Sequence, residues 1–408
     1  MTSLNPSLQL RLSVMMFFQY MMFAVWWIPL AAYLANIGLS RNLTALVMSS
    51  MAFGSVFAPM VGMLADRYFR SNRLLAALNI GVALSLLFAV QTTQPVSLFI
   101  ALLLAMIFYM PTWALTSAIA LANAPSEFFP RIRVLGTVGW ILAGGFSIVM
   151  VSFWQVDFDG TRLPFYFGAA LAVITALTNL TLPATPPKGD TQKASLLEVM
   201  GFRSVVLLKD RNFAIFVVLF FFSMIPFAMY WSYFSEYLQD SGYRFITVTM
   251  SLGQVTEILI LLAVPFFIRK IGLRKTMALG ILALIVRYLA LYLAGGEAHM
   301  PFVLLGVGVH GIIFGFYHLG AQIYTNHKAP KSLQSQAQGL IFFITFAPGL
   351  LVGNFACGWI IGLYSEPGAT GVIYQWDSIW GITALMAVVV LAGFLVLFKE
   401  EDYKTVSL

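Results

Sequence analysis

The chain has 408 residues, of which 60% are hydrophobic and 10% are charged, and its mean hydropathy is +0.88. Because ordinary soluble domains carry about 25% charged residues, this composition excludes a soluble enzyme or binding domain and predicts an integral membrane protein. The formal net charge of +7 could suit a nucleic acid, but the basic residues are distributed among loops as in membrane proteins, so we expect no nucleic-acid partner.

Twelve apolar segments follow one another along the chain, each long enough to cross about 30 Å of hydrocarbon. They fall into two sets of six on either side of a polar, proline-containing connection. We therefore expect an all-α integral membrane protein in which two six-helix bundles, 1–185 and 212–408, are joined by a cytoplasmic linker at 186–211. The segments span approximately residues 13–35, 43–65, 74–91, 97–122, 131–154, 163–183, 213–236, 246–269, 273–295, 300–326, 335–363 and 375–398.

Basic residues are concentrated in alternate loops, as the positive-inside rule describes. The loops of one side carry only Arg41, Arg162 and Arg244 beside several acidic residues. We therefore expect both termini in the cytoplasm. The basic residues of the expected cytoplasmic loops are Arg67, Arg70, Arg73, Lys188, Lys193, Arg203, Lys209, Arg211, Arg269, Lys270, Arg274, Lys275, Lys328 and Lys331.

The end of the second span reads G-M-L-A-D-R at residues 62–67, which resembles the G-x-L-A-D-R signature of the major facilitator superfamily. Gly62 permits close helix approach, and Asp66 at the membrane edge can pair with arginines or with a helix N-terminus. We expect Asp66 and Arg67 to belong to a latch that breaks during gating. Charges that only anchor the loop in the cytoplasm would explain the cations but not the acid. The corresponding stretch of the second half, 265–275, lacks the acid.

Three side chains of the fifth span share one helical face, since Arg133, Thr137 and Trp140 lie at i, i+4 and i+7. The guanidinium is a rigid fork of several donors, and an indole can stack on a flat ring. These groups suit a ligand with a ring and hydroxyls. Packing between helices is an equal alternative for Trp140 in a chain with 15% aromatic residues.

Glu257 lies at the centre of a long apolar stretch, 246–268. A charge at mid-bilayer costs a few kcal/mol, so such a residue usually faces the protein interior or a wet cavity and serves a transport pathway. Gln254 shares its face one turn away. We expect both residues to contact the substrate and Glu257 to take the coupling proton. The alternative is a permanent ion pair with Arg133 or with Arg287, which we expect to be structural.

In the tenth span, His310, Phe314, Tyr317 and His318 recur at i, i+4, i+7 and i+8, which is one face of a regular helix. We expect His310, Phe314 and Tyr317 to contact the substrate, with packing as the alternative. Neither histidine has a cysteine or carboxylate nearby in the sequence, so we expect no metal. Cys357 is the single cysteine, which excludes an intramolecular disulfide. We also expect no cofactor.

Four stretches of the chain carry more specific patterns: F-P-R-I-R-V-L-G-T-V-G-W at 129–140, S-L-G-Q-V-T-E at 251–257 with V-P-F-F at 264–267, A-Q-G at 337–339, and the aromatic opening of the first span. Together they resemble the bacterial nucleoside:proton symporter family. The resemblance covers nearly the whole chain and implies the major facilitator fold, a place in the inner membrane of a bacterium, and import of nucleosides driven by the proton gradient. It also implies that the ligand lies near Arg133, Thr137, Trp140, Gln254, Glu257 and Phe314.

The chain departs from this family at sites that bear on the substrate. The seventh span of the family carries amide side chains that contact the ligand, whereas residues 225–229 here read I-P-F-A-M. A tyrosine of the tenth span is replaced by His310, and an acid that some relatives carry there is Gly315. Glu257 is consequently the expected proton-coupling group, and the preferred nucleoside stays open.

We expect transport by alternating access, in which two bundles rock about a central site. A proton-coupled sugar or drug transporter on the same scaffold is the first alternative, and a non-transporting membrane receptor is the second. Loops too short for an output domain argue against the receptor. The sequence has no G-x-S-x-G elbow and no Walker loop, so we expect no enzymatic activity. We expect a monomer in the lipid bilayer.

Overall fold

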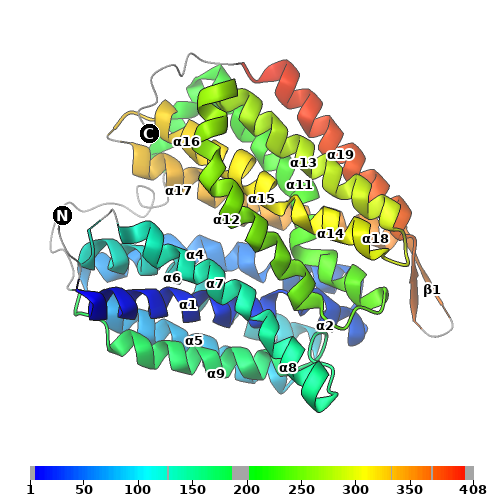
Figure 1. Ribbon diagram of the computed structural model, residues 1–408, viewed down its shortest axis with the longest axis horizontal. Helices are drawn as coiled ribbons and strands as arrows, with labels where there is room; N and C mark the ends of the chain where they lie inside the picture. Colours follow the sequence, from blue (N-terminus) through cyan, green and yellow to red (C-terminus); the bar gives the residue numbers. More distant parts are fainter. Residues whose placement is uncertain (1–4, 126–127, 186–201, 332, 369–370, 400–408) are drawn as a thin grey trace. The chain divides into compact units, whose positions relative to one another are not determined.

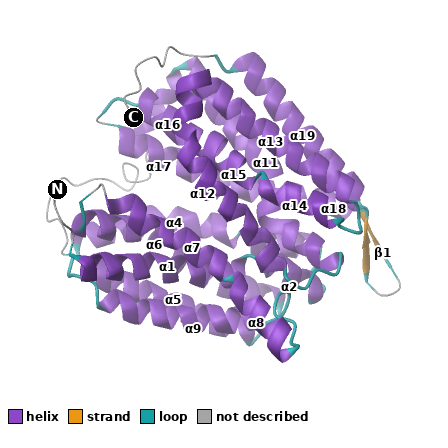
Figure 2. Cartoon of the chain, in the orientation of Figure 1, coloured by secondary structure: helices purple, strands orange, loops and turns teal. Residues whose placement is uncertain are grey.

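The computed structural model describes residues 5–125, 128–185, 202–331, 333–368 and 371–399, without the side chains of 62–67 and 335. Nearly all regular structure in this part of the chain is helical (Figure 2). Twelve helical stretches there are long and apolar enough to cross a membrane. The prediction of a multi-pass helical membrane protein with twelve spans is therefore confirmed.

The chain divides into two compact units, which are described separately here. Unit 1 contains Met1–Val199 together with Gly242–Ser251, and unit 2 contains Met200–Ser241 and Leu252–Leu408. The first turn of α12 (Ile246–Ile271) thus groups with unit 1 and the rest of that helix with unit 2. Of the predicted linker 186–211, residues 186–201 lie outside the described residues.

Unit 1 is built around α1, which packs against α7 and α9, while α6 packs against α4 and α5 (Figure 1). Four of its helices begin with proline at the first or second position, where a missing amide hydrogen costs nothing. Pro29 interrupts the first span for the opposite reason, since it cannot continue a helical hydrogen-bond ladder. The helices are α1 (Pro6–Trp27), α2 (Leu30–Asn36), α3 (Arg41–Met48), α4 (Ser50–Arg67), α5 (Ser71–Val90), α6 (Pro95–Asn123), α7 (Phe129–Leu142), α8 (Gly144–Trp154) and α9 (Leu163–Leu180).

A buried polar network joins α1 to α5 and α6. Gln19 and Asn79 exchange two amide hydrogen bonds of 3.0 Å, and Gln19 Nε2 also donates to Thr112 Oγ1 at 2.9 Å. All three side chains are fully buried. Because a buried amide without partners costs about 1–3 kcal/mol, this network orders the helices that carry the candidate site of unit 1.

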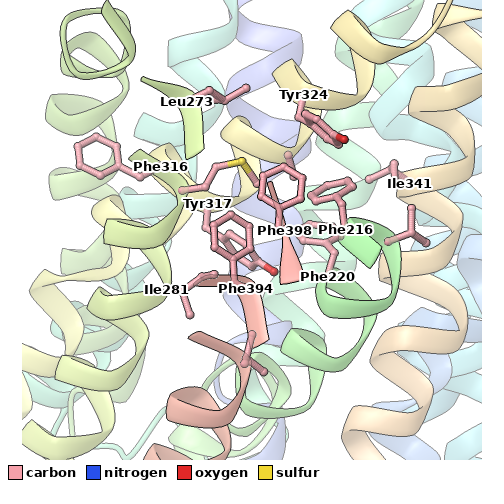
Figure 3. Packing of buried hydrophobic residues seen from close by; sticks show 14 of the residues in the cluster. Phe216, Phe220, Leu273, Ile281, Phe316, Tyr317, Tyr324, Ile341, Phe394 and Phe398 are labelled. Atoms are coloured by element: carbon pink, nitrogen blue, oxygen red, sulfur yellow. The ribbon is translucent and has the colours of Figure 1, made fainter. Parts of the chain in front are cut away.

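Unit 2 has a core rich in aromatic residues, where α13 packs against α19 and α11 packs against α18 and α19. Figure 3 shows Phe216 and Phe220 of α11 beside Tyr317, Tyr324 and Phe394 in this cluster. The helices are η2 (Phe202–Lys209), α11 (Arg211–Asp240), α12 (Ile246–Ile271), α13 (Leu273–Ala294), α14 (Met300–Gly308), α15 (His310–Ile312), η3 (Ile313–His318), α16 (Leu319–Lys328), α17 (Gln334–Ile344), η4 (Thr345–Gly349), α18 (Leu350–Leu363) and α19 (Trp376–Leu397).

Two spans of unit 2 contain a π-helical segment, η3 in the tenth span and η4 in the eleventh. η4 contains Pro348, whose missing amide hydrogen removes one regular helical bond. Short π segments inside α-helices are rare and are frequent at functional sites. η3 carries three of the four residues that the sequence placed on one face of the tenth span.

A small hairpin, which the all-α description does not include, connects α18 to α19 (Figure 2). Its strands are β1 (Ser365–Pro367) and β2 (Val372–Tyr374), paired antiparallel with Glu366 opposite Ile373. The hydroxyl of Tyr374 donates to Glu236 Oε1 at 2.8 Å. The hairpin is thus attached to the end of α11, outside the helical spans.

Candidate functional site

In unit 1, the predicted residues of the fifth span lie on α7, which is held closely against α1. A Cβ added at Gly139 would overlap the backbone of Phe17, so the two helices touch through their main chains. Trp140 is 8% exposed and packs edge-to-face on Phe23, with ring centroids 5.7 Å apart. Thr137 is half-buried one turn earlier. The predicted stripe of α7 is therefore anchored at Trp140 and more open toward Arg133.

Arg133 is oriented by an aromatic side chain of α1. Its Cζ atom lies 4.2 Å from the ring centroid of Tyr20, a cation–π contact, and the Tyr20 ring stacks nearly parallel to Trp113 of α6. Gly136 leaves room for this arrangement, because a Cβ there would come within 2.9 Å of the Tyr20 ring and 3.0 Å of Arg133 Nη1. Tyr20 and Trp113 were not predicted, since aromatic residues in an apolar span carry no distinctive spacing.

In unit 2, the orientation of α12 decides whether Glu257 faces lipid. Most exposed apolar side chains form one stripe along the helix, at Leu252, Val255, Leu259 and Leu262, whereas Leu261, 38% exposed, lies one turn from Glu257. At about 100° of rotation per residue, Glu257 falls on the opposite side of the helix from this stripe. Its side chain is 20% exposed. Glu257 therefore lies on the side of α12 that packs against His310 and Gly311 of the tenth span.

Two glycines bring α12 against the tenth span at the level of Glu257. A Cβ added at Gly311 would lie 2.5 Å from the amide nitrogen of Glu257, and one at Gly253 would lie 2.9 Å from His310 Cβ. The amide of Gly311 donates to Thr256 Oγ1 at 3.1 Å. This backbone-to-backbone contact fixes His310 beside Glu257.

Glu257, His310 and Arg287 form a contiguous series of three polar side chains. Glu257 Oε2 lies 3.7 Å from His310 Nε2, and Arg287 Nη2 lies 3.0 Å from His310 Nδ1. Arg287 also donates from Nε to the carbonyl of Gly306 at 2.9 Å, and its Cζ lies 3.7 Å above the ring of Tyr230. Arg287 is fully buried, so the expected structural role fits its surroundings, and it reaches Glu257 through His310.

An aromatic wall continues from His310 along the tenth span. Phe314 stacks on His318 with centroids 4.8 Å apart, and His310 lies 4.7 Å from Phe314. Phe227 of α11 packs against both Phe314 and His318, and Trp231 stacks on Phe227. The apolar seventh span thus contributes rings where the family resemblance implies amides. Nothing in the spacing of Phe227 and Trp231 distinguishes them from the other apolar residues of the seventh span.

The remaining predicted residues have different surroundings. Tyr317 is 2% exposed within the hydrophobic cluster of Figure 3, where its ring packs on Phe220 at 5.2 Å. We therefore assign Tyr317 to the core rather than to the ligand site. Gln254 is half-buried on α12. Asp66 and Arg67 end α4, but their side chains lie outside the described residues, so the latch remains a prediction.

Comparisons with known proteins identify the family of the chain. Residues 6–403 match the family described as nucleoside H+ symporter. The transporter YegT of Escherichia coli (strain K12) is 33% identical over 96% of this chain and 94% of its own. Nucleoside permease NupG of the same organism is 28% identical over 98% of this chain and 97% of its own.

A crystal structure of the nucleoside transporter NupG, in a single-residue variant, superposes with a TM-score of 0.88 at 27% identity. The match covers 96% of this chain and all of that chain. The family match and the fold therefore agree from end to end. The chain belongs to the nucleoside H+ symporter family and is a secondary active transporter with the major facilitator fold, which imports nucleosides together with protons.

Proposed function

We propose that Glu257 takes the proton that drives nucleoside import, and that the nucleoside is bound by polar and aromatic side chains that the sequence predicts. In unit 1 the ligand residues are Arg133, Thr137 and Trp140. In unit 2 they are Gln254, Glu257, His310 and Phe314. Alternating access of this site to the two sides of the membrane completes the cycle.

The observation that carries the proposal is the placement of Glu257 on the protein-facing side of α12, against His310. A carboxyl group facing lipid would pay the full cost of charge in hydrocarbon and would have no route for a proton. Beside His310, the Glu257 carboxyl group can exist in both its ionised and its neutral form. The ionised form attracts the N–H of His310, and the neutral form offers an O–H to a ligand oxygen or nitrogen.

We expect the other side chains to recognise different parts of a nucleoside. Phe314 offers a ring for stacking on the base, beside His318 and Phe227. Arg133 presents guanidinium donors, and Tyr20 limits its rotation. Gln254 can donate to and accept from ribose hydroxyls. The apolar residues at 225–229 of the seventh span make the ligand residues of unit 2 more aromatic than the family pattern implies.

Glu257→Gln tests the coupling role. The amide keeps the size and one acceptor of the carboxyl group but cannot take or release a proton. We expect proteoliposomes with this variant to exchange labelled uridine or adenosine across the membrane, yet to stop accumulating it when a proton gradient is imposed. The matched control is Glu297→Gln, at an exposed turn with a side chain 86% exposed. Accumulation at the wild-type rate by Glu257→Gln would remove Glu257 from the coupling step.

A further inference from the structure

The contacts of His310 determine which of its ring nitrogens carries the hydrogen. Arginine has hydrogen-bond donors and no acceptor, so Arg287 Nη2, 3.0 Å away, must donate to Nδ1. The imidazole is then neutral, and its hydrogen is on Nε2. His310 is 2% exposed, and the second bond of Arg287, to the carbonyl of Gly306, holds the guanidinium in place. Arg287 therefore selects a single form of His310.

The Nε2–H group of His310 is directed at Glu257 without being satisfied there. The distance from Nε2 to Glu257 Oε2 is 3.7 Å, longer than the 2.7–3.2 Å of a normal N–H···O bond. Among the described residues, His310 Nε2 has no hydrogen-bond partner. A buried donor in this state gains free energy by closing onto an acceptor. The nearest carboxylate is the group proposed to take the coupling proton.

We propose that His310, held by Arg287 in its Nε2–H form, is the donor onto which ionised Glu257 closes, and that protonation of Glu257 releases this carboxyl group to hydrogen-bond the nucleoside. The neutral acid cannot donate to His310, because Nε2 already carries a hydrogen and Nδ1 is occupied by Arg287. In each cycle, one proton from water on one side of the membrane adds to a carboxylate oxygen of Glu257. The proton then leaves that oxygen for water on the other side of the membrane. His310 stays neutral throughout.

This inference rests on the proposed coupling role of Glu257. Within unit 2, the described titratable or charged groups near His310 include Arg287 from α13, Tyr230 from α11, with its ring 5.8 Å from that of His310, and His318 from η3. Arg287 acts through His310 and is a positioning residue. The replacement of the family's tyrosine by His310 then has a consequence, since a phenol would not depend on Arg287 for its form.

The test is the pH dependence of labelled uridine binding to purified full-length transporter, compared between His310→Met and His310→Gln. Methionine fills the space without a donor, whereas the glutamine amide nitrogen can replace Nε2–H. Losing a donor to a carboxylate favours its neutral form. We expect the pH midpoint of binding to rise by about one unit in His310→Met and by less than about half of that in His310→Gln. Unchanged midpoints in both variants would overturn the proposal.

Two further comparisons separate this inference from the coupling role and from misfolding. The effect of His310→Met should vanish in a Glu257→Gln background, and thermal melts should show that both His310 variants remain folded. Arg287→Met should raise the midpoint when His310 is present but not in the His310→Met background. A shift that persists there would mean that the Arg287 charge acts directly on Glu257. If wild-type binding showed no midpoint, the coupling role itself would fail instead.

Discussion

At the residue scale, the site of unit 1 depends on how little space surrounds Arg133. The guanidinium lies over the Tyr20 ring. Gly136 follows one turn later in α7, and a Cβ added there would contact both the guanidinium and the Tyr20 ring. Both neighbours are side-chain atoms, so they can move rather than force α7 away from α1. A methyl group here would therefore displace the donor fork and leave the helix packing in place.

We expect Gly136→Ala to weaken uridine binding by about tenfold, which corresponds to roughly 1.4 kcal/mol, with little change in the melting temperature. Calorimetric titration and a thermal melt on the same preparation measure both quantities. The matched control is Gly145→Ala in α8, where an added Cβ meets nothing within 4 Å. Equal effects of the two substitutions on binding would show that Arg133 is not positioned by this contact.

The sequence was informative about residues whose chemistry is unusual in a membrane and uninformative about the rest. The sequence identifies Glu257 because a carboxyl group in an apolar stretch is costly and usually serves a function. His310 and Phe314 were identified by spacing. Phe227 and Trp231, which complete the aromatic wall, resemble any other apolar residues of a span. Their role follows only from ring contacts made in three dimensions.

At the element scale, hydropathy predicted the spans but not the changes of helix type within them. The predicted face of the tenth span assumed a regular 3.6-residue turn. In η3 the hydrogen bonds run from i to i+5, so the wider turn keeps Phe314 and His318 stacked and directs Tyr317 into the core. No residue of this segment is a proline, so the sequence did not indicate the change.

Another element-scale feature is the attachment of the first turn of α12 to the connection between α8 and α9. Asp159, 5% exposed, accepts hydrogen bonds from the amide of Thr247 at 3.0 Å, from its hydroxyl at 2.5 Å and from Ser147 Oγ at 2.9 Å. Asp157, in the same connection, also forms an exposed ion pair of 2.9 Å with Arg244, which precedes α12. Burial raises the pKa of Asp159 from its usual 3.8, and the hydrogen bonds offset part of this rise.

The raised pKa gives this attachment a definite pH dependence. The folded protein binds the proton of Asp159 more tightly than the unfolded chain does, so its contribution to stability is complete below about pH 3.8 and declines as pH rises through the folded-state pKa. We expect the difference in melting temperature between the wild type and Asp159→Asn to shift against the wild type as pH rises from about 3.8 through the folded-state pKa of Asp159. Asp157→Asn, which changes an exposed carboxylate, is the control. A difference that grew with pH would contradict the assignment.

At the scale of the whole molecule, an even number of spans requires both termini to lie on the same side of the membrane. The twelve candidate spans, combined with the basic residues of alternate loops, predict that this side is the cytoplasm. The chain provides a convenient background for testing this orientation. Cys357 is the single cysteine, is fully buried, and donates from Sγ to the carbonyl of Ile225 at 3.2 Å.

In a Cys357→Ala background, we expect Glu297→Cys, at the turn between α13 and α14, to react with a membrane-impermeant maleimide in intact cells. Lys331→Cys, at an exposed position between α16 and α17, should react only after the cells are permeabilised. The two positions are separated by the tenth span, so they must lie on opposite sides if that span crosses the membrane once. Labelling of both in intact cells would contradict the topology, and the reverse pattern would place the termini outside.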